Sequence, residues 1–192
     1  MVSVTHASRR CAAVVAAMPA AALAQSAQAP LTAEMMWQLK RIGSPAISPD
    51  GRHAVYAVTH FDAENDKGEA DLFRVAIAGG IPQRLTSMKG NESEPAWSPD
   101  GRWIAFTARR GDDKQSQLYV IGTGGGEAIR VSDVPTGVSA PKWFPDSRRI
   151  AFITEVCSAI DPTRVLAGIG ISTTAVRGAV AIAVIGVANI GG

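Results

Sequence analysis

The 192-residue chain has few of the residues that usually carry chemistry. It contains two cysteines and three histidines, and no histidine follows His60. A nucleophilic serine, an aspartate and a histidine in that chain order therefore cannot occur beyond residue 60. His53 and His60 have no cysteine or carboxylate cluster with metal-ligand spacing around them, so we expect both to be ordinary surface or edge residues.

The two cysteines are not expected to form a disulfide. Arg9-Arg10, a short apolar run and an Ala-x-Ala site ending at Ala24 make up the pattern of a secretory signal peptide over residues 1–24. Cleavage after Ala24 would remove Cys11 and leave Cys157 alone. The apolar run is too short to span a membrane. The pattern therefore predicts export, with the mature protein periplasmic or secreted.

The chain also lacks an excess of one charge. It has 19 basic and 17 acidic residues, and removal of Arg9 and Arg10 with the signal leaves 17 of each (19 − 2). No basic stripe remains as a footprint for nucleic acid, so we expect no nucleic-acid partner.

What the sequence does contain is a seven-residue motif that occurs three times, here called the repeated phrase. Pro-Ala-Ile-Ser-Pro-Asp-Gly at 45–51 returns as Pro-Ala-Trp-Ser-Pro-Asp-Gly at 95–101 and, more loosely, as Pro-Lys-Trp-Phe-Pro-Asp-Ser at 141–147. An apolar run follows each copy. A second block, which includes Leu-Phe-Arg-Val at 72–75, recurs 46 positions later. Such a repeat indicates one supersecondary unit stacked on copies of itself.

The phrase has the composition of a tight turn between two strands. Proline fixes φ, aspartate hydrogen-bonds the local backbone, and glycine accepts the positive φ of a chain reversal. The predicted structural turn residues are Pro49, Asp50, Gly51, Pro99, Asp100, Gly101, Pro145 and Asp146. Ser147 stands where the other copies have glycine, so the third turn should be strained or of another type.

The apolar runs do not alternate with polar residues, which indicates strands that are covered on both faces. Four short strands in a unit of 46 residues are typical of a β-propeller blade, and a solenoid of β-arches is the competing geometry. Residues 43–155 hold about two full blades and part of a third, fewer than a closed ring needs. The predicted fold class is all-β: an incomplete β-propeller with a short N-terminal helix and an irregular apolar tail.

The helix is predicted over residues 31–42, after a linker at 25–30. Thr32 can cap it, and Gly43 should end it. Its apolar residues fall on one stripe that we expect to pack on the propeller edge. These residues are Met35, Met36, Leu39 and Ile42.

The tail, residues 156–192, does not follow the repeat. It contains no tryptophan, phenylalanine or tyrosine, and its only charged residues are Asp161, Arg164 and Arg177. Three interpretations remain open. The first is a membrane-spanning helix, the one case in which we expect membrane association. The second is a genuine alternative end of the domain. The third is an out-of-frame translation, which we favour because a regular blade stops within one strand.

The string Trp-Ser-Pro-Asp-Gly-Arg-Trp-Ile-Ala-Phe at 97–106 resembles the blade motif of TolB-like propellers. The flanking phrases at 31–46, 117–127 and 135–146 resemble the amino-terminal propeller of bacterial prolyl oligopeptidase-family serine peptidases, particularly their acylaminoacyl-peptidase and dipeptidyl-peptidase members. The resemblance covers roughly residues 31–155. It implies a propeller that screens the active site of a hydrolase domain and admits short peptides.

The hydrolase domain of that family carries its nucleophile in a Gly-x-Ser-x-Gly elbow, and this sequence has none. Residues 137–141 come nearest, but Pro141 replaces the last glycine. We therefore expect no catalytic, cofactor-binding or metal-binding residue and no activity from this chain alone. The acidic loop at 62–66 is read as a solvated loop rather than a calcium site.

Two other groups of residues have weaker interpretations. Trp97 and Trp143 occupy the repeat position of Ile47, so we expect them in the blade core. Glu92 and Glu94 could face a central channel, although no substrate-binding motif matches them.

The sequence therefore predicts the substrate-gating, amino-terminal propeller of an exported serine peptidase that acts on peptides. Peptide substrates would be partners of the full-length enzyme. The alternative is a TolB-like periplasmic binding or scaffold propeller with no enzymatic activity.

Overall fold

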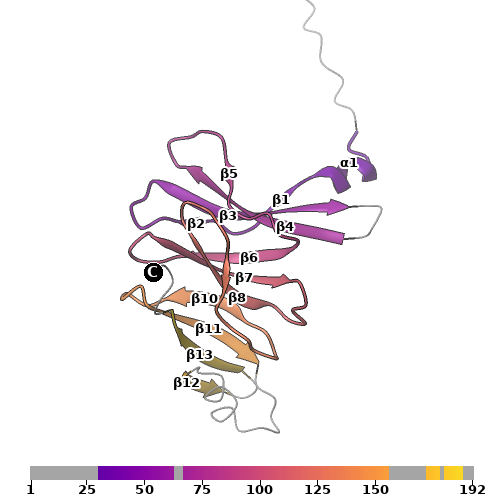
Figure 1. The fold of residues 1–192 in the computed structure, drawn as a ribbon. Coiled ribbons are helices and arrows are strands. Elements are labelled where there is room, and N and C mark those ends of the chain that lie inside the picture. The colour runs from indigo at the N-terminus through magenta and orange to yellow at the C-terminus, as the bar shows by residue number, and fades with distance from the viewer. Residues whose placement is uncertain (1–29, 63–66, 156–171, 178–179, 188–192) are drawn as a thin grey trace, which may run out of the picture. The chain divides into compact units, whose positions relative to one another are not determined.

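A computed structural model describes residues 30–62, 67–155, 172–177 and 180–187 (Figure 1). The predicted signal peptide, most of the linker, Cys157 and much of the tail lie outside these ranges. So do residues 63–66, which make up most of the acidic loop. Within the described residues the strands form two sheets of nine and four strands, which divide into three blades.

The first blade is built around a long hairpin of β3 (His53–Asp62) and β4 (Lys67–Ala76), whose ten residues pair in register. β1 (Arg41–Ile42) and β2 (Ala46–Ile47) both pair with β3, so they form one inner strand with a break. β5 (Gln83–Arg84) pairs with β4 on the other side. The blade therefore has the order inner strand, β3, β4, β5.

The second blade repeats this order with a single inner strand. Its strands are β6 (Gly90–Trp97), β7 (Trp103–Arg110), β8 (Gln117–Gly122) and β9 (Ile129–Arg130), each antiparallel to the next. A parallel bridge between β4 and β6 joins the first two blades into one sheet. β3 and β7 each begin two residues after the glycine of the repeated phrase, as the turn chemistry predicts.

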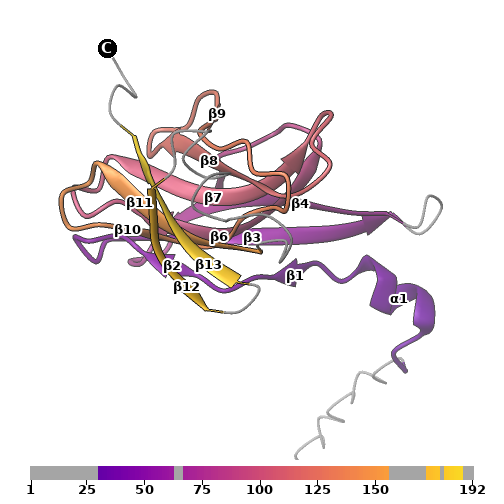
Figure 2. The same ribbon diagram turned by 90° about the horizontal axis from the view of Figure 1, so that it is seen from below.

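The third blade begins in the same way, with β10 (Ser139–Trp143) and β11 (Arg149–Glu155). Its other strands come from the tail, and they are out of chain order: β13 (Val180–Gly186) pairs with β11, and β12 (Ser172–Arg177) pairs with β13 (Figure 2). The prediction of an incomplete all-β propeller is confirmed. The tail, however, is not irregular throughout, because its β-branched and alanine-rich segments can pair with the open edge of β11.

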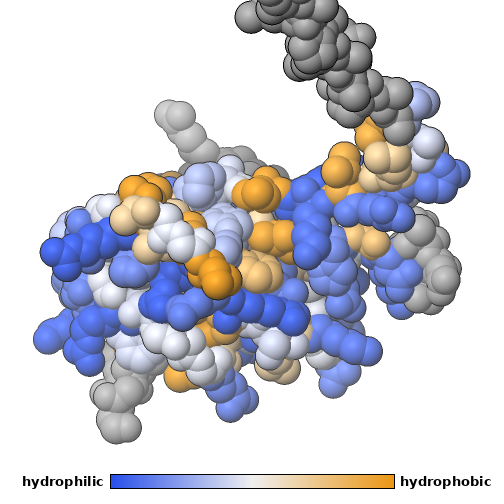
Figure 3. Space-filling model, turned by 90° about the horizontal axis from the view of Figure 1, so that it is seen from above, coloured by the Kyte–Doolittle hydropathy of each residue, from blue (hydrophilic) through white to orange (hydrophobic). Residues whose placement is uncertain are grey.

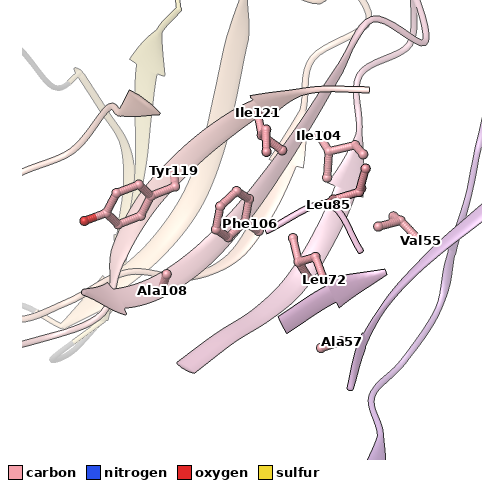
Figure 4. Close-up of a cluster of buried hydrophobic side chains, with 9 residues drawn as sticks. All are labelled: Val55, Ala57, Leu72, Leu85, Ile104, Phe106, Ala108, Tyr119 and Ile121. Atoms are coloured by element: carbon pink, nitrogen blue, oxygen red, sulfur yellow. The ribbon is translucent and has the colours of Figure 1, made fainter. Parts of the chain in front are cut away.

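Each inner layer of the core lies between two blades. Residues of β7 alternate in direction: Ile104 and Phe106 pack towards the first blade, and Ala105 packs towards the third. Figure 4 shows the first of these layers, in which Val55 and Leu72 of the first blade lie against Phe106 of the second. A strand covered on both faces has no polar face, which explains the continuous apolar runs in the sequence.

The helix α1 (Ala33–Gln38) is shorter than the stretch 31–42 that we predicted. Thr32 caps it as expected, its hydroxyl accepting from the Met35 N–H at 3.3 Å. The chain becomes extended at Leu39, because Arg41 and Ile42 pair with β3 and form β1.

The apolar stripe of this segment is exposed rather than packed on the propeller edge. Met36 is 59% exposed and Ile42 is 70% exposed. Trp37 makes an edge-on contact with Phe61 of β3, with ring centroids 6.2 Å apart. None of the helical residues in the described ranges forms a segment long and apolar enough to cross a bilayer.

Candidate functional site

The first two copies of the repeated phrase form the same hydrogen-bonded turn. In the first copy, Ser48 Oγ donates to Asp50 Oδ1 at 2.5 Å, and this oxygen also accepts from the Arg52 N–H at 3.0 Å. Gly51 has φ 70°, as the turn requires. These hydrogen bonds hold the pKa of Asp50 below its usual value, with the Ser48 hydroxyl contributing most. Asp100 makes the equivalent bonds to Ser98 and Arg102.

The third turn keeps the geometry with different side chains. Ser147 occupies the glycine position with φ 54°, a left-handed conformation that costs a non-glycine residue energy. Phe144 replaces the serine of the other copies, and the Arg149 guanidinium lies 4.5 Å from its ring centroid. Asp146 accepts from the Arg148 N–H and from Arg149 Nε, and these bonds lower its pKa.

The three turns lie next to one another at one edge of the blades. Ser147 Oγ accepts from the Asp100 N–H at 3.0 Å, which links the second turn to the third. The first and second turns border a cleft of about 500 Å³ between their blades. Pro49, Asp50, Pro99, Asp100 and Gly101 line this cleft, together with His53, Arg74 and Trp97. Five of the eight predicted turn residues therefore meet at one site.

The inner strands carry a second polar surface. β6 and β10 each have a bulge at the same point of the repeat, with Glu94 at φ 52° and Ala140 at φ 49°. Glu94 is exposed, and its Oε2 accepts from the Ala140 N–H at 2.9 Å and from the Thr107 hydroxyl at 3.2 Å. Backbone conformations of this kind often occur at functional sites. Glu94 therefore joins two inner strands and still presents a carboxylate to solvent.

Glu92 is different, although it lies two residues away. Its side chain is fully buried, and its carboxylate accepts from the Leu72 N–H, the Thr86 hydroxyl and Arg110 Nη2. Burial raises the pKa of this carboxyl, while Thr86 and Arg110 act in the opposite direction. Of the two glutamates that we considered for a central channel, only Glu94 is accessible.

Arg110 belongs to a buried polar network that the sequence did not point to. Its guanidinium lies 5.2 Å from the ring centroid of Phe106 and 5.0 Å from that of Tyr119. Tyr119 donates to Asp113 Oδ2 at 2.7 Å. Burial, reinforced by Asp113, raises the pKa of Tyr119 to about 12. The sequence signal that could have pointed to this network is a charged residue, Arg110, at the end of a strand that is covered on both faces.

A polar pocket of about 410 Å³ lies at the end of β11 and the start of β10. Its hydroxyl groups come from Ser116, Thr136, Ser139 and Thr154, and Glu155 adds a carboxylate. Such groups can hydrogen-bond a peptide main chain. Ser139 itself begins β10, and its Oγ donates to the Ile153 carbonyl at 3.4 Å, so this segment is a strand start and not a nucleophile elbow.

Within the described residues, His53, His60, Trp97 and Trp143 are the histidines and tryptophans that the sequence analysis singled out. His53 and His60 lie at opposite ends of β3, and His60 Nε2 is 3.8 Å from Glu69 Oε2. Trp97 and Trp143 are half-buried, and their indole N–H groups donate to Ala46 and Ala96 of the preceding blade at 3.0 and 3.1 Å. Ile47, at the same repeat position, is 53% exposed and is not part of the core. In the described part of the chain, no three histidine, cysteine or acidic side chains group as a metal site.

Comparison with known proteins places this fold in a family. The model of the TolB beta propeller domain matches residues 33–165, more than half of the chain. Dipeptidyl-peptidase 5 of Porphyromonas gingivalis is 40% identical over 85 residues, which are 44% of this chain and 12% of that protein. The Tol-Pal system protein TolB of Francisella tularensis is 35% identical over 75 residues, 39% of this chain and 16% of that protein.

A solved structure shows the same fold. The putative TolB from Agrobacterium tumefaciens superposes with a TM-score of 0.53 and 22% identity, covering 77% of this chain and 46% of that one. The matched regions span about one eighth to one sixth of the length of the two curated relatives. The resemblance to TolB-like propellers and to the propellers of bacterial peptidases is thereby confirmed, and the chain belongs to the TolB beta propeller domain family.

Proposed function

We propose that this chain is the substrate-gating propeller of an exported serine peptidase that acts on peptides. The observation that carries the proposal is the 40% identity with a dipeptidyl-peptidase, which exceeds the 35% identity with TolB. The propeller would control which peptides reach a hydrolase domain, and the nucleophile would belong to that domain.

Two accessible features of the described residues suit contact with peptides. Glu94 presents a carboxylate from the inner strand, where it can attract a peptide's amino group. Thr136 and Ser139 line the polar pocket, and each hydroxyl donates to a carbonyl of this chain, so its oxygen is left to accept from a peptide N–H. Neither surface contains a nucleophile with a base beside it, so the role supported here is selection and not bond cleavage.

The decisive test is the coding DNA. Translation in all three frames through and beyond codon 155 should recover further Pro-Asp-Gly blades and then a Gly-x-Ser-x-Gly elbow. Blades without an elbow would overturn the peptidase assignment. Purified chain should not hydrolyse dipeptidyl-naphthylamides, and hydrolysis blocked by a serine-directed phosphonate would contradict a purely gating role.

Export is tested separately. Residues 1–24 fused to a reporter that is active only outside the cytoplasm should produce signal, and the mature chain should begin at Gln25. Replacement of Arg9 and Arg10 by glutamate should abolish the signal. An intact amino terminus on chain recovered from cells would count against export.

A binding or scaffold propeller similar to TolB is the second candidate. The identity with the Francisella protein supports it, as does the superposition of 77% of this chain on the Agrobacterium protein. This candidate predicts that further blades complete the ring and that no hydrolase domain is encoded with them.

A further inference from the structure

The guanidinium of Arg110 has donors that its neighbours do not satisfy. Nη2 donates to Glu92, and Nη1 donates to Met88 Sδ at 3.7 Å, although a thioether sulfur is only a weak acceptor. Nε is buried and has no hydrogen-bond partner within the described part of the chain. Because the side chain is only 4% exposed, these donors lack the strong acceptors that water supplies to a surface arginine.

Met88 contacts this buried guanidinium and also reaches solvent. It belongs to the connection between β5 and β6 and is 53% exposed. Met88 and Arg110 line one pocket of about 310 Å³, together with Ser87 and Glu127. Met88 and Glu127 are exposed, so the pocket opens to solvent and a small solute can reach the sulfur. All of these residues belong to the first two blades and the connection between them.

The charges around the pocket favour a neutral acceptor over an anion. Glu92 already balances the charge of Arg110, and Glu127 adds a negative charge to the pocket wall. A further anion would be repelled by these carboxylates. The open donors of Arg110 therefore suit an oxygen that carries a strong dipole but no net charge. The sulfoxide of Met88 supplies such an oxygen.

We propose that Met88 is an oxidation site and that Arg110 binds the oxygen of its sulfoxide. In the reaction with hydrogen peroxide, a lone pair of Met88 Sδ attacks one peroxide oxygen and the O–O bond breaks. The proton of the transferred oxygen passes to the leaving hydroxide, which departs as water. The sulfur is oxidised by two electrons, and the peroxide is reduced.

The product fits the position of Met88. The methionine side chain has three rotatable bonds, so it can turn the new oxygen towards Nη1 and Nε of Arg110. Sulfoxides usually disrupt a protein by bringing a polar group into an apolar core. Met88 is more than half exposed, so it has little apolar contact to lose. Its oxidation therefore adds a hydrogen bond between the segment that enters β6 and the end of β7, and it should stabilise the second blade.

The first test compares melting temperatures before and after treatment with hydrogen peroxide. Met35 and Met36 are the other methionines of the described residues, 43% and 59% exposed, and hydrophobic residues also reach the surface on the side viewed in Figure 3. Both are replaced by leucine, and peptide mass mapping shows that Met88 has gained one oxygen. The melting temperature should rise by about 2–4 °C, the shift that one net hydrogen bond gives in a chain of this length.

The matched control is Met88→Leu in the same background. It accounts for oxidation at every other position, Cys157 included, and its melting temperature should not rise. Treatment with the two methionine sulfoxide reductases, one for each epimer, should reverse the shift in the protein that keeps Met88.

A second test needs no oxidant. Met88→Gln places a neutral carbonyl oxygen beside Arg110, whereas Met88→Leu offers no acceptor. Met88→Gln should therefore melt about 2–4 °C above Met88→Leu. In an Arg110→Leu, Glu92→Gln background, which lacks both buried charges, this difference and the peroxide shift should both disappear. Leucine replaces Arg110 here because, unlike methionine, it is not oxidised.

Three results would each overturn the proposal. The first is a Met88 that stays reduced in wild type while Met35 and Met36 are oxidised. The second is a melting temperature that falls or stays constant when Met88 is oxidised. The third is a shift that persists in the background without Arg110, because the guanidinium would then not be the group that binds the sulfoxide.

Discussion

The first junction lies between the first and second blades, and the second junction lies between the second and third blades. Both are built from the same repeat, but they satisfy their buried polar groups in different ways. At the first junction, the hydroxyl of Thr86 accepts from the Leu72 N–H and donates to Glu92, which in turn pairs with Arg110. At the second junction, Ser132 accepts from the Leu118 N–H and donates to Gln117.

The charged residue is absent from the second junction. Val138 occupies the repeat position of Glu92, and Gln117 completes the network by bonding to both the N–H and the carbonyl of Val134. A neutral amide can satisfy these groups without bringing a charge out of water. Glu92 requires the buried Arg110 beside it, so the first junction depends more heavily on one pair.

The largest effect should follow from Arg110→Met. This substitution leaves the buried Glu92 carboxylate without its cation, and we expect a loss of about 3–5 kcal/mol in the free energy of unfolding. Urea denaturation monitored by tryptophan fluorescence measures it. The double variant Arg110→Met, Glu92→Gln should recover most of the loss, and a single variant within about 1 kcal/mol of wild type would show that the pair is not important.

The same Arg110→Met variant should have a distinctive pH dependence. Burial raises the pKa of Glu92 above its unfolded value, so the folded state favours the protonated acid. Without Arg110, stability should rise as pH falls towards the unfolded pKa of Glu92, because the carboxyl can then become neutral. The double variant should lack this rise, because Glu92→Gln removes the group that titrates.

At the second junction, Gln117→Leu should cost less, about 1–3 kcal/mol. It leaves the Val134 N–H and carbonyl and the Ser132 hydroxyl without the partner that each now has, but it leaves no unpaired charge. Ser116→Ala in the adjacent loop is a suitable control. A loss as large as that of Arg110→Met would remove the distinction between the two junctions.

Tyr119→Phe tests the edge of the first junction at high pH. The pKa of Tyr119 is raised from 10 to about 12, so the folded state favours the protonated phenol. The stability of wild type relative to Tyr119→Phe is full below pH 10 and should fall by about 1.4 kcal/mol per pH unit between 10 and 12. Unfolding free energies of the two proteins measured across this range should converge, and a constant difference would contradict the assignment.

The smallest effect is expected where the second and third turns meet. Ser147→Ala removes the acceptor of the Asp100 N–H but keeps the left-handed backbone, and it should cost about 1 kcal/mol. Ser147→Gly loses the same hydrogen bond and relieves the backbone, so it should be close to neutral. Ser147→Gly should therefore melt at a higher temperature than Ser147→Ala, and the reverse order would contradict the role given to the left-handed backbone.

The sequence by itself determined the blades up to residue 155. The repeated phrase sets its own turn, because Ser48, Asp50 and Gly51 bond within five residues, and that turn positions the strands on each side. Trp97 and Trp143 were predicted for the blade core, and the structure adds the carbonyl that each indole bonds. Local chemistry of this kind can be read without knowledge of distant neighbours.

Only the tertiary structure decided which charges are buried and which strand completes the third blade. Glu92 and Glu94 are the same residue type two positions apart in the chain. Folding buries Glu92 beside Arg110, whereas Glu94 stays accessible next to Ala140. β13, and not β12, pairs with β11, although β13 comes later in the chain. These outcomes depend on partners far away in sequence, because strand pairing and side-chain desolvation are set by what the folded chain brings together.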